Sequence, residues 1–150
     1  MPNVSNATLS PDELRPGQQL ALLGPGGQTL ARPLMLALGP LGRLRGLLGR
    51  PPLRPGQGML LRPCRQVHTF FMGYAIDVVF LDRGGVVLGL AADLAPWRVS
   101  PYEAGACCVV ELPAGQAARS ALAVGQRMVF RLTDEVSGDN VMENREPDGP

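Results

Sequence analysis

The segment Asp77–Leu81 constrains the fold more than any other part of the sequence. After its first residue it is a continuous apolar run, Val-Val-Phe-Leu, which is typical of a strand buried on both faces. The paired residues Gly84 and Gly85 follow at once and supply the positive φ angles that a tight hairpin turn requires. Val86–Leu90 is again apolar and predicts the returning strand. The sequence therefore predicts a buried β-hairpin at the centre of the protein.

The high content of glycine and proline predicts which kinds of secondary structure surround this hairpin. The chain of 150 residues contains 19 Gly and 15 Pro, and both interrupt helices and strands. Many short elements joined by tight turns are expected, and the class is mainly β: a small β-barrel or β-sandwich of about six to eight short strands with two short helices. Beside the hairpin, the expected strands are Leu20–Leu23, Thr29–Leu38, Met59–Leu61, Val67–Met72, Ala106–Leu112 and Met128–Leu132, and the expected helices are Leu41–Leu48 and Pro113–Leu122.

The length predicts a single domain. We expect a flexible lead-in over residues 1–19, one β-rich domain over 20–132, and an acidic, disordered tail over 133–150. Apolar runs are too short for a membrane span, which needs roughly 18–20 residues, and the polar N-terminus lacks a secretory signal. An odd set of three cysteines favours free thiols in a reducing compartment. The expected location is therefore the cytoplasm.

The charge distribution is lopsided although the net charge is only +1. All basic residues are Arg, and eight of them lie between Glu13 and Asp77, where no acidic residue occurs. One interpretation is a GC-rich genome that replaces Lys with Arg; another is an anion-facing surface, because guanidinium groups match phosphate and carboxylate. The same stretch has no aromatic residue before Phe70, which argues against nucleic acid as a partner.

His68 is the only histidine and follows Cys64 by four residues. Its imidazole is a candidate general base or metal ligand, and Cys64 with His68 is a candidate nucleophile–base pair. Cys64, His68 and Cys107 would supply the ligands that zinc prefers. Against zinc, there is no CxxC pair, and Cys107 and Cys108 point to opposite faces of a strand. We therefore expect no cofactor, with zinc as the alternative. The structural interpretation of His68 is that its ring only holds a loop in place.

Two carboxylates fall inside apolar strands. Asp77 and Glu111 must find hydrogen-bond donors, because an unpaired buried carboxylate is costly. We expect Asp77 to accept from backbone amides or to pair with Arg98, and Asp82 to open the glycine turn. Asp77, Glu111, His68 and Arg98 are expected to share one polar pocket, which is either a buried structural network or a small-ligand site.

Aromatic residues cluster around the same segments. Trp97 and Tyr102 lie in a loop with prolines, and Phe70, Phe71 and Tyr74 are close in sequence to His68. These rings either stack on a sugar or another planar ligand, or they plug one end of the β domain.

Four groups of segments together resemble a known family, domain of unknown function 192. They are Arg45–Arg50 with Gly58–Leu61, His68–Met72 with Ile76–Asp82, Pro96–Arg98, and Val110–Gly115. The resemblance covers about residues 30–132. It implies a compact β fold with short helices and implies no reaction. Many relatives begin with a secretion or lipoprotein signal, and this sequence departs from them in that respect.

The functional expectation is a non-enzymatic β domain that binds a small ligand or a protein partner through a polar and aromatic pocket. The predicted ligand-binding residues are His68, Thr69, Met72, Asp77, Trp97, Arg98 and Glu111. One alternative is a hydrolase or metal-dependent enzyme that uses His68 with Cys64 or Asp77. Another is an anion-binding module that uses the Arg-rich first half. The sequence leaves the oligomeric state open.

Overall fold

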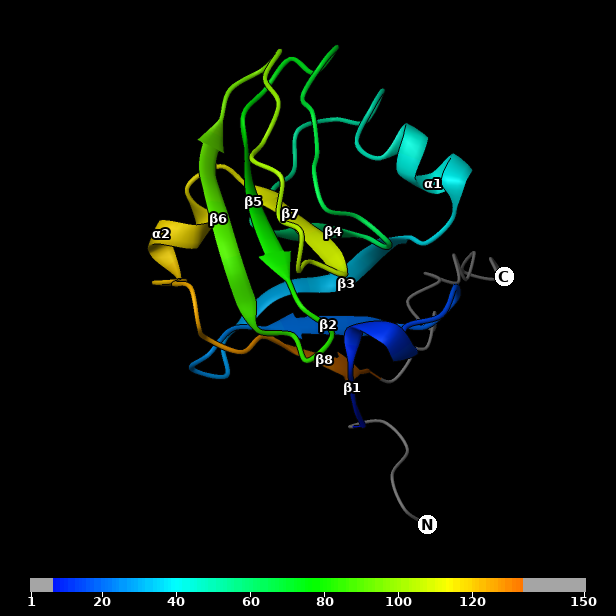
Figure 1. Cartoon of the computed structure of the whole chain (residues 1–150). Helices are drawn as coiled ribbons and strands as arrows, with labels where there is room; N and C mark the ends of the chain where they lie inside the picture. Colours follow the sequence, from blue (N-terminus) through cyan, green and yellow to red (C-terminus); the bar gives the residue numbers. More distant parts are fainter. Residues whose placement is uncertain (1–6, 134–150) are drawn as a thin grey trace, which may run out of the picture.

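The computed structural model describes residues 7–133, and they form one mainly β unit with a single eight-stranded sheet (Figure 1). The sheet has the strand order β1-β8-β2-β3-β4-β7-β5-β6, with β1 and β6 as its edges, and it is not closed into a barrel. The elements are β1 (Thr8–Leu9), the 3₁₀ turn η2 (Pro11–Glu13), β2 (Leu20–Leu23), β3 (Thr29–Ala37), α1 (Pro40–Arg45), β4 (Gly56–Leu61), β5 (Ile76–Leu81), β6 (Val87–Leu94), β7 (Cys108–Pro113), α2 (Gln116–Arg119) and β8 (Val129–Leu132).

The predicted central hairpin is confirmed. Strands β5 and β6 pair in antiparallel fashion, and Asp82 Oδ1 accepts hydrogen bonds from the amides of Gly84 at 2.8 Å and Val86 at 2.9 Å. Gly85 has a φ of 82°, a conformation that glycine adopts without steric cost. On its other side β5 pairs with β7. Every residue of β5 and of β7 is buried, as expected of central strands.

The sheet separates two hydrophobic clusters, because successive side chains of a strand point to opposite faces. Val79 and Leu81 of β5 belong to a cluster that also contains Ala117 of α2, and we call this side of the sheet the α2 face. Val78 and Phe80 belong to a second cluster that contains Leu47, just after α1, and this side is the α1 face. Figure 1 shows the two helices on opposite sides of the central strands, with β2 and β8 crossing β5 and β6 below them.

The strand predicted over Val67–Met72 is not formed. His68 makes only an isolated bridge to Val99. Thr69 exchanges backbone hydrogen bonds with Arg98 and Trp97 instead, and Phe71 has a φ of 63°, which no strand residue adopts. The segment is therefore a turn fastened to the loop after β6. Its apolar residues indicated burial correctly at two positions, Val67 and Met72.

Both helices are shorter than the apolar spacing predicts. Helix α1 ends at Arg45 because Gly46 takes a φ of 43° and closes the last turn onto Gly42. Helix α2 begins only at Gln116, because β7 continues through Pro113 and Gly115 stands before the helix with a φ of 88°.

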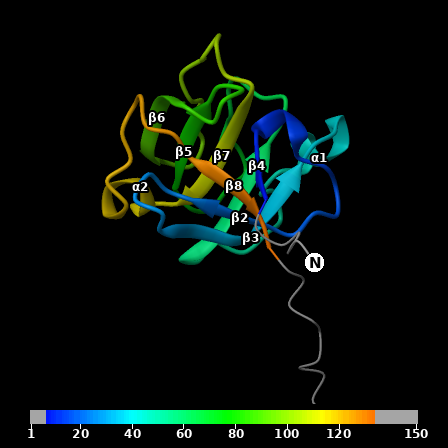
Figure 2. The same cartoon turned by 90° about the horizontal axis from the view of Figure 1, so that it is seen from below.

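The segment before β2, expected to be a flexible lead-in, is partly ordered. β1 pairs with β8, and Leu14 is fully buried in the α2-face cluster. Seen from below in Figure 2, β1 and η2 lie beside the blue and orange strands of the sheet. The predicted disordered tail lies outside the described residues except for Thr133. Among residues 7–133 no helix has the length and hydrophobicity of a membrane span.

Candidate functional site

A cavity of about 350 Å³ opens on the α1 face beside β7. Its apolar wall comes from Leu47, Leu61, Val67 and Met72, and its floor includes Glu111. These residues lie just after α1, on β4, on the connection from β4 to β5 and on β7, so the cavity exists only once the sheet has assembled. A small, mostly apolar recess with few polar groups is typical of ligand sites. We call it the Glu111 cavity.

Glu111 is the most unusual residue of this cavity. It sits in the middle of β7, opposite Met59 of β4 and Val78 of β5, and only 4% of it is exposed. Its Oε2 atom is buried without a hydrogen-bond partner. Burial raises the pKa of this carboxyl from 4.5 to about 7, because a low-dielectric surrounding disfavours the charged form. A buried carboxylate without donors is expensive and is typical of functional sites.

Tyr74 adds a second unsatisfied atom to the same face. Its hydroxyl oxygen is buried and has no hydrogen-bond partner, and its ring packs against the α1-face cluster. Burial raises the pKa of Tyr74, and the nearby negative charge of Glu111 raises it further. Among the described residues, two buried side-chain polar atoms therefore lack a partner, and both lie on the α1 face.

His68 stands at the exposed rim of the Glu111 cavity. Its Nδ1 accepts a hydrogen bond from the amide of Phe70 at 3.2 Å, and its ring stacks on Phe70 with centroids 4.9 Å apart. Nδ1 is therefore engaged in a local turn, while the rest of the ring faces solvent and the cavity mouth.

Zinc is the alternative to the expectation of no cofactor, with Cys64, His68 and Cys107 as its ligands. In the part of the chain that the structure describes, no three His, Cys, Asp or Glu side chains are grouped to hold a metal ion. Cys108 is buried in the α2-face cluster, whereas Cys107 is half-buried. Cys64 lines the Glu111 cavity and its thiol donates to the carbonyl of Gln66 at 3.2 Å. Burial raises the pKa of Cys64, which disfavours a thiolate nucleophile.

Asp77 lies on the other face of the sheet from Glu111. Its register partner on β7 is Leu112, which belongs to the α2-face cluster. Its two carboxylate oxygens accept hydrogen bonds at 2.8 Å from the amides of Asp93 and Ala117. The expectation that Asp77 accepts from backbone amides is confirmed. The expectation that Asp77 and Glu111 share one pocket is wrong, because the side chains point to opposite faces.

Next to the cavity, the turn at Thr69 is hydrogen-bonded to the loop that contains Trp97 and Arg98. The Thr69 hydroxyl donates to the carbonyl of Ala95 at 2.6 Å and accepts from the amide of Arg98 at 2.9 Å. Trp97 is 55% exposed and packs against the ring of Phe71, with centroids 4.7 Å apart. Arg98 is also exposed. Thr69 therefore holds the loop together, and the aromatic rings lie on the surface rather than plugging the end of the sheet.

The structure thus divides the predicted site residues among three places. His68, Met72 and Glu111 meet at the cavity, joined by Cys64; Thr69, Trp97 and Arg98 lie in the neighbouring turn and loop; Asp77 is across the sheet. Sequence reasoning missed the cavity residues Arg43, Leu47, Leu61 and Val67. Their only signal is the apolar character of the segments around them, which also fits an ordinary core position.

Comparison with solved structures supports the fold. A protein of unknown function from Novosphingobium aromaticivorans superposes with a TM-score of 0.64 at 20% identity, over 81% of this chain and 91% of that one. A putative transcription regulator from Sinorhizobium meliloti gives a TM-score of 0.64 at 21% identity, over 83% and 94% of the two chains. At these identities the likeness shows a shared fold.

Comparison of sequences identifies the family. A UPF0127 protein from Thermococcus sibiricus is 30% identical over 99 residues, which are 63% of this chain and 64% of that protein, so the match spans less than two thirds of its length. The model of the family DUF192, described as "Uncharacterized ACR", matches residues 23–130. These residues run from the last residue of β2 to the middle of β8 and contain all strands between them. The chain belongs to the DUF192 family.

Proposed function

We propose that the protein is a binding module that holds a small, largely apolar ligand in the Glu111 cavity. One observation carries the proposal: Glu111 is buried on the cavity floor with an Oε2 atom that no group of the described residues satisfies. Buried polar atoms are almost always hydrogen-bonded. A ligand that donates a hydrogen bond to the Glu111 carboxylate would compensate for this buried acceptor on binding.

The cavity's walls and floor define the class of ligand. Leucine, valine and methionine side chains give an apolar wall, so most of the ligand is hydrocarbon. Glu111 accepts hydrogen bonds when ionised, and a charged acceptor prefers a charged donor. An apolar primary amine fits best, followed by amides and alcohols, which offer neutral donors.

Binding is better supported than hydrolysis. The catalytic candidates would need His68 beside an activated Cys64 or beside Asp77. Burial raises the pKa of Cys64, and Asp77 bonds two backbone amides on the opposite face. The Glu111 cavity needs no such constellation in order to hold a ligand.

A matched fragment screen tests the proposal. Apolar primary amines, amides and alcohols, and hydrocarbons of the same shape, would be added to the protein while its thermal unfolding is followed. Amines are expected to raise the melting temperature above pH 7, where Glu111 is ionised. Hydrocarbons of the same shape are expected to raise it much less, because they leave the Glu111 carboxylate without a donor.

The variant Glu111→Gln keeps the shape of the side chain and removes its charge. Amine affinity should fall about tenfold, while the matched control Glu103→Gln, which lies outside the cavity lining, should bind amines as the wild type does. A library in which no member shifts the wild-type melting temperature would refute the proposal. Amine binding that is equal in both variants would place the ligand elsewhere.

A further inference from the structure

A second and larger cavity adjoins the Glu111 cavity. It measures about 830 Å³ and is lined by segments far apart in the sequence: η2, α1, the turn after β4, the β5–β6 turn and the segment just before β7. Four arginines line it, from α1, the end of β4 and the two turns, namely Arg43, Arg62, Arg65 and Arg83. Three of the eight arginines between Glu13 and Asp77 therefore meet Arg83 at one hollow of the surface, which we call the arginine cavity.

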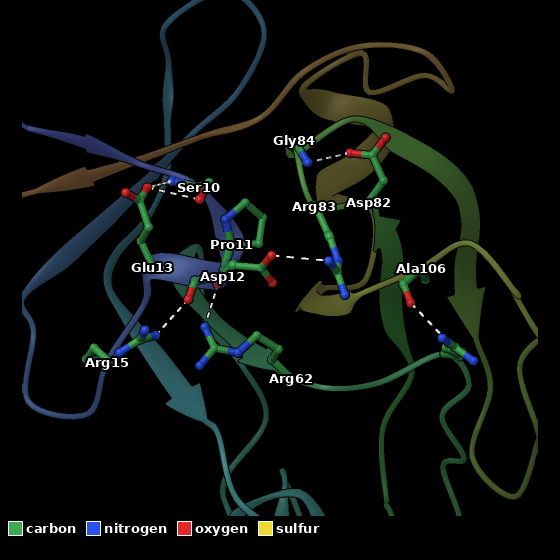
Figure 3. A network of polar contacts seen from close by, with 11 residues as sticks. Ser10, Pro11, Asp12, Glu13, Arg15, Arg62, Asp82, Arg83, Gly84 and Ala106 are labelled. Atoms are coloured by element: carbon green, nitrogen blue, oxygen red, sulfur yellow. Dashed lines mark hydrogen bonds and ion pairs between the residues drawn. The ribbon is translucent and has the colours of Figure 1, made fainter.

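Three of the four guanidinium groups are held in place by the backbone. Arg62 donates to the carbonyl of Pro11, Arg43 to that of Pro63 at 3.0 Å, and Arg65 to that of Ala106 at 3.3 Å. Figure 3 shows Arg62 turned toward Pro11, with Arg83 reaching toward Asp12 nearby. A guanidinium has five N–H donors, so each group keeps donors for another acceptor. Groups fixed in advance lose less entropy when they bind an anion.

Carboxylates balance this charge only in part. Among the side chains that the structure describes there is one ion pair, in which Arg83 Nε lies 3.7 Å from Asp12 Oδ2, and both side chains are largely exposed. The second acid of the lining, Asp82, accepts from two amides of the β5–β6 turn. Four arginines face two aspartates, which leaves an excess of two positive charges and three arginines without a carboxylate within 4 Å.

We propose that the arginine cavity is a subsite for a phosphate or carboxylate group, and that it forms one continuous binding site with the Glu111 cavity. The second part rests on the proposed function. Its basis is that Arg43, Cys64 and Gln66 line both cavities, so the two cavities are direct neighbours and a ligand that extends past these three side chains would reach both. Guanidinium forks match phosphate and carboxylate oxygens in pairs.

Together the two cavities define the ligand more narrowly than either does alone. It is a low-molecular-weight compound with an anionic group at one end, an apolar middle and a hydrogen-bond donor at the other end. The anion lies among the arginines, the hydrocarbon against the leucines after α1, and the donor at Glu111. Aminoalkyl phosphates are the simplest compounds of this class.

Inorganic phosphate alone tests the anion subsite. Calorimetric titration of the wild type at constant ionic strength should show saturable binding. Arg65→Gln, at an exposed position, should weaken it about tenfold, and so should Arg62→Gln, which is half-buried and must first be shown to fold. Arg54→Gln makes the same charge change outside both cavity linings and should leave it unchanged. Equal phosphate binding by Arg54→Gln and Arg65→Gln would overturn the subsite.

A series of aminoalkyl phosphates with two to eight methylenes then tests continuity. One length should bind at least about tenfold more tightly than inorganic phosphate, and Glu111→Gln should abolish this gain while leaving phosphate binding intact. A series without any gain would overturn the continuous site. Phosphate binding that persists when no apolar amine binds would refute the proposed function but not the anion subsite, so the two failures are distinguishable.

Discussion

Two buried carboxylates on paired strands of the same sheet have opposite surroundings. Asp77 of β5 faces α2 and fills both of its oxygens with backbone amides. Glu111 of β7, one register position away, faces α1 and leaves Oε2 without a partner. Both side chains are almost fully buried, at 1% and 4% exposed. Burial alone therefore does not distinguish them, and the number of available donors does.

The difference separates a structural carboxylate from a candidate functional one. Asp77 connects the end of β6 and the start of α2 to the central strand by hydrogen bonds, and these bonds stabilise the folded state. Glu111 destabilises the folded chain when it is ionised. Departures from complete polar satisfaction are expected where a protein serves a function rather than its own stability. The α1 face carries that departure, and the α2 face does not.

Removing the satisfied carboxylate should have the largest effect. Asp77→Ala is expected to lower the free energy of unfolding by about 4 kcal/mol, because two backbone amides lose their acceptor at roughly 1–3 kcal/mol each. Urea unfolding at pH 7 measures the change. Asp82→Ala is the matched control, since it also removes two amide bonds but at a half-exposed turn, and should cost about 1 kcal/mol. Equal losses would show that burial adds nothing.

The unsatisfied carboxylate should reveal itself through pH. The folded chain retains the Glu111 proton up to about pH 7, whereas the unfolded chain releases it near 4.5. The contribution of Glu111 to the free energy of unfolding is therefore fully present below pH 4.5, and it is lost as the pH rises through about 7. The shift corresponds to roughly 3 kcal/mol. The difference in unfolding free energy between wild type and Glu111→Gln should change by that amount between pH 4.5 and 8; parallel profiles would contradict the assignment.

The hydroxyl groups of Thr69 and Tyr74 show the same difference between a hydrogen-bonded and an unpaired polar group, with smaller expected effects on stability. Thr69→Val should cost about 2 kcal/mol, because the Arg98 amide loses its acceptor. Tyr74→Phe should change stability by less than about 0.5 kcal/mol or increase it, because the hydroxyl that it removes has no partner. Thermal unfolding of both variants measures the effects. A large loss in Tyr74→Phe would mean that its hydroxyl is bonded in solution.

The smallest effect is expected at the cavity rim. His68→Ala should change the free energy of unfolding by no more than about 0.5 kcal/mol, since the ring is exposed and its bond is local. Thermal unfolding provides the measurement. A melting temperature that falls by several degrees would instead show that His68 stabilises the loop.

Local sequence was enough to determine the frame of the fold. The apolar run of β5, the Asp82 turn with its glycines and the predominance of short strands all follow from side-chain size, turn chemistry and the distribution of glycine and proline. The amide partners of Asp77 were also expected in kind, because a carboxylate in such a strand must find donors. These predictions rest on interactions within a few residues or on a requirement that holds for any fold.

Only the tertiary structure decided which residues meet. Whether Asp77 and Glu111 share a pocket depends on the register of β5 against β7, and a shift of one residue would place both side chains on the same face. The turn at Thr69 exists because a loop some thirty residues away supplies its hydrogen bonds. The arginines converge because η2, β4 and the β5–β6 turn pack together. Contacts between segments distant in sequence set these outcomes, and no local pattern of residues encodes them.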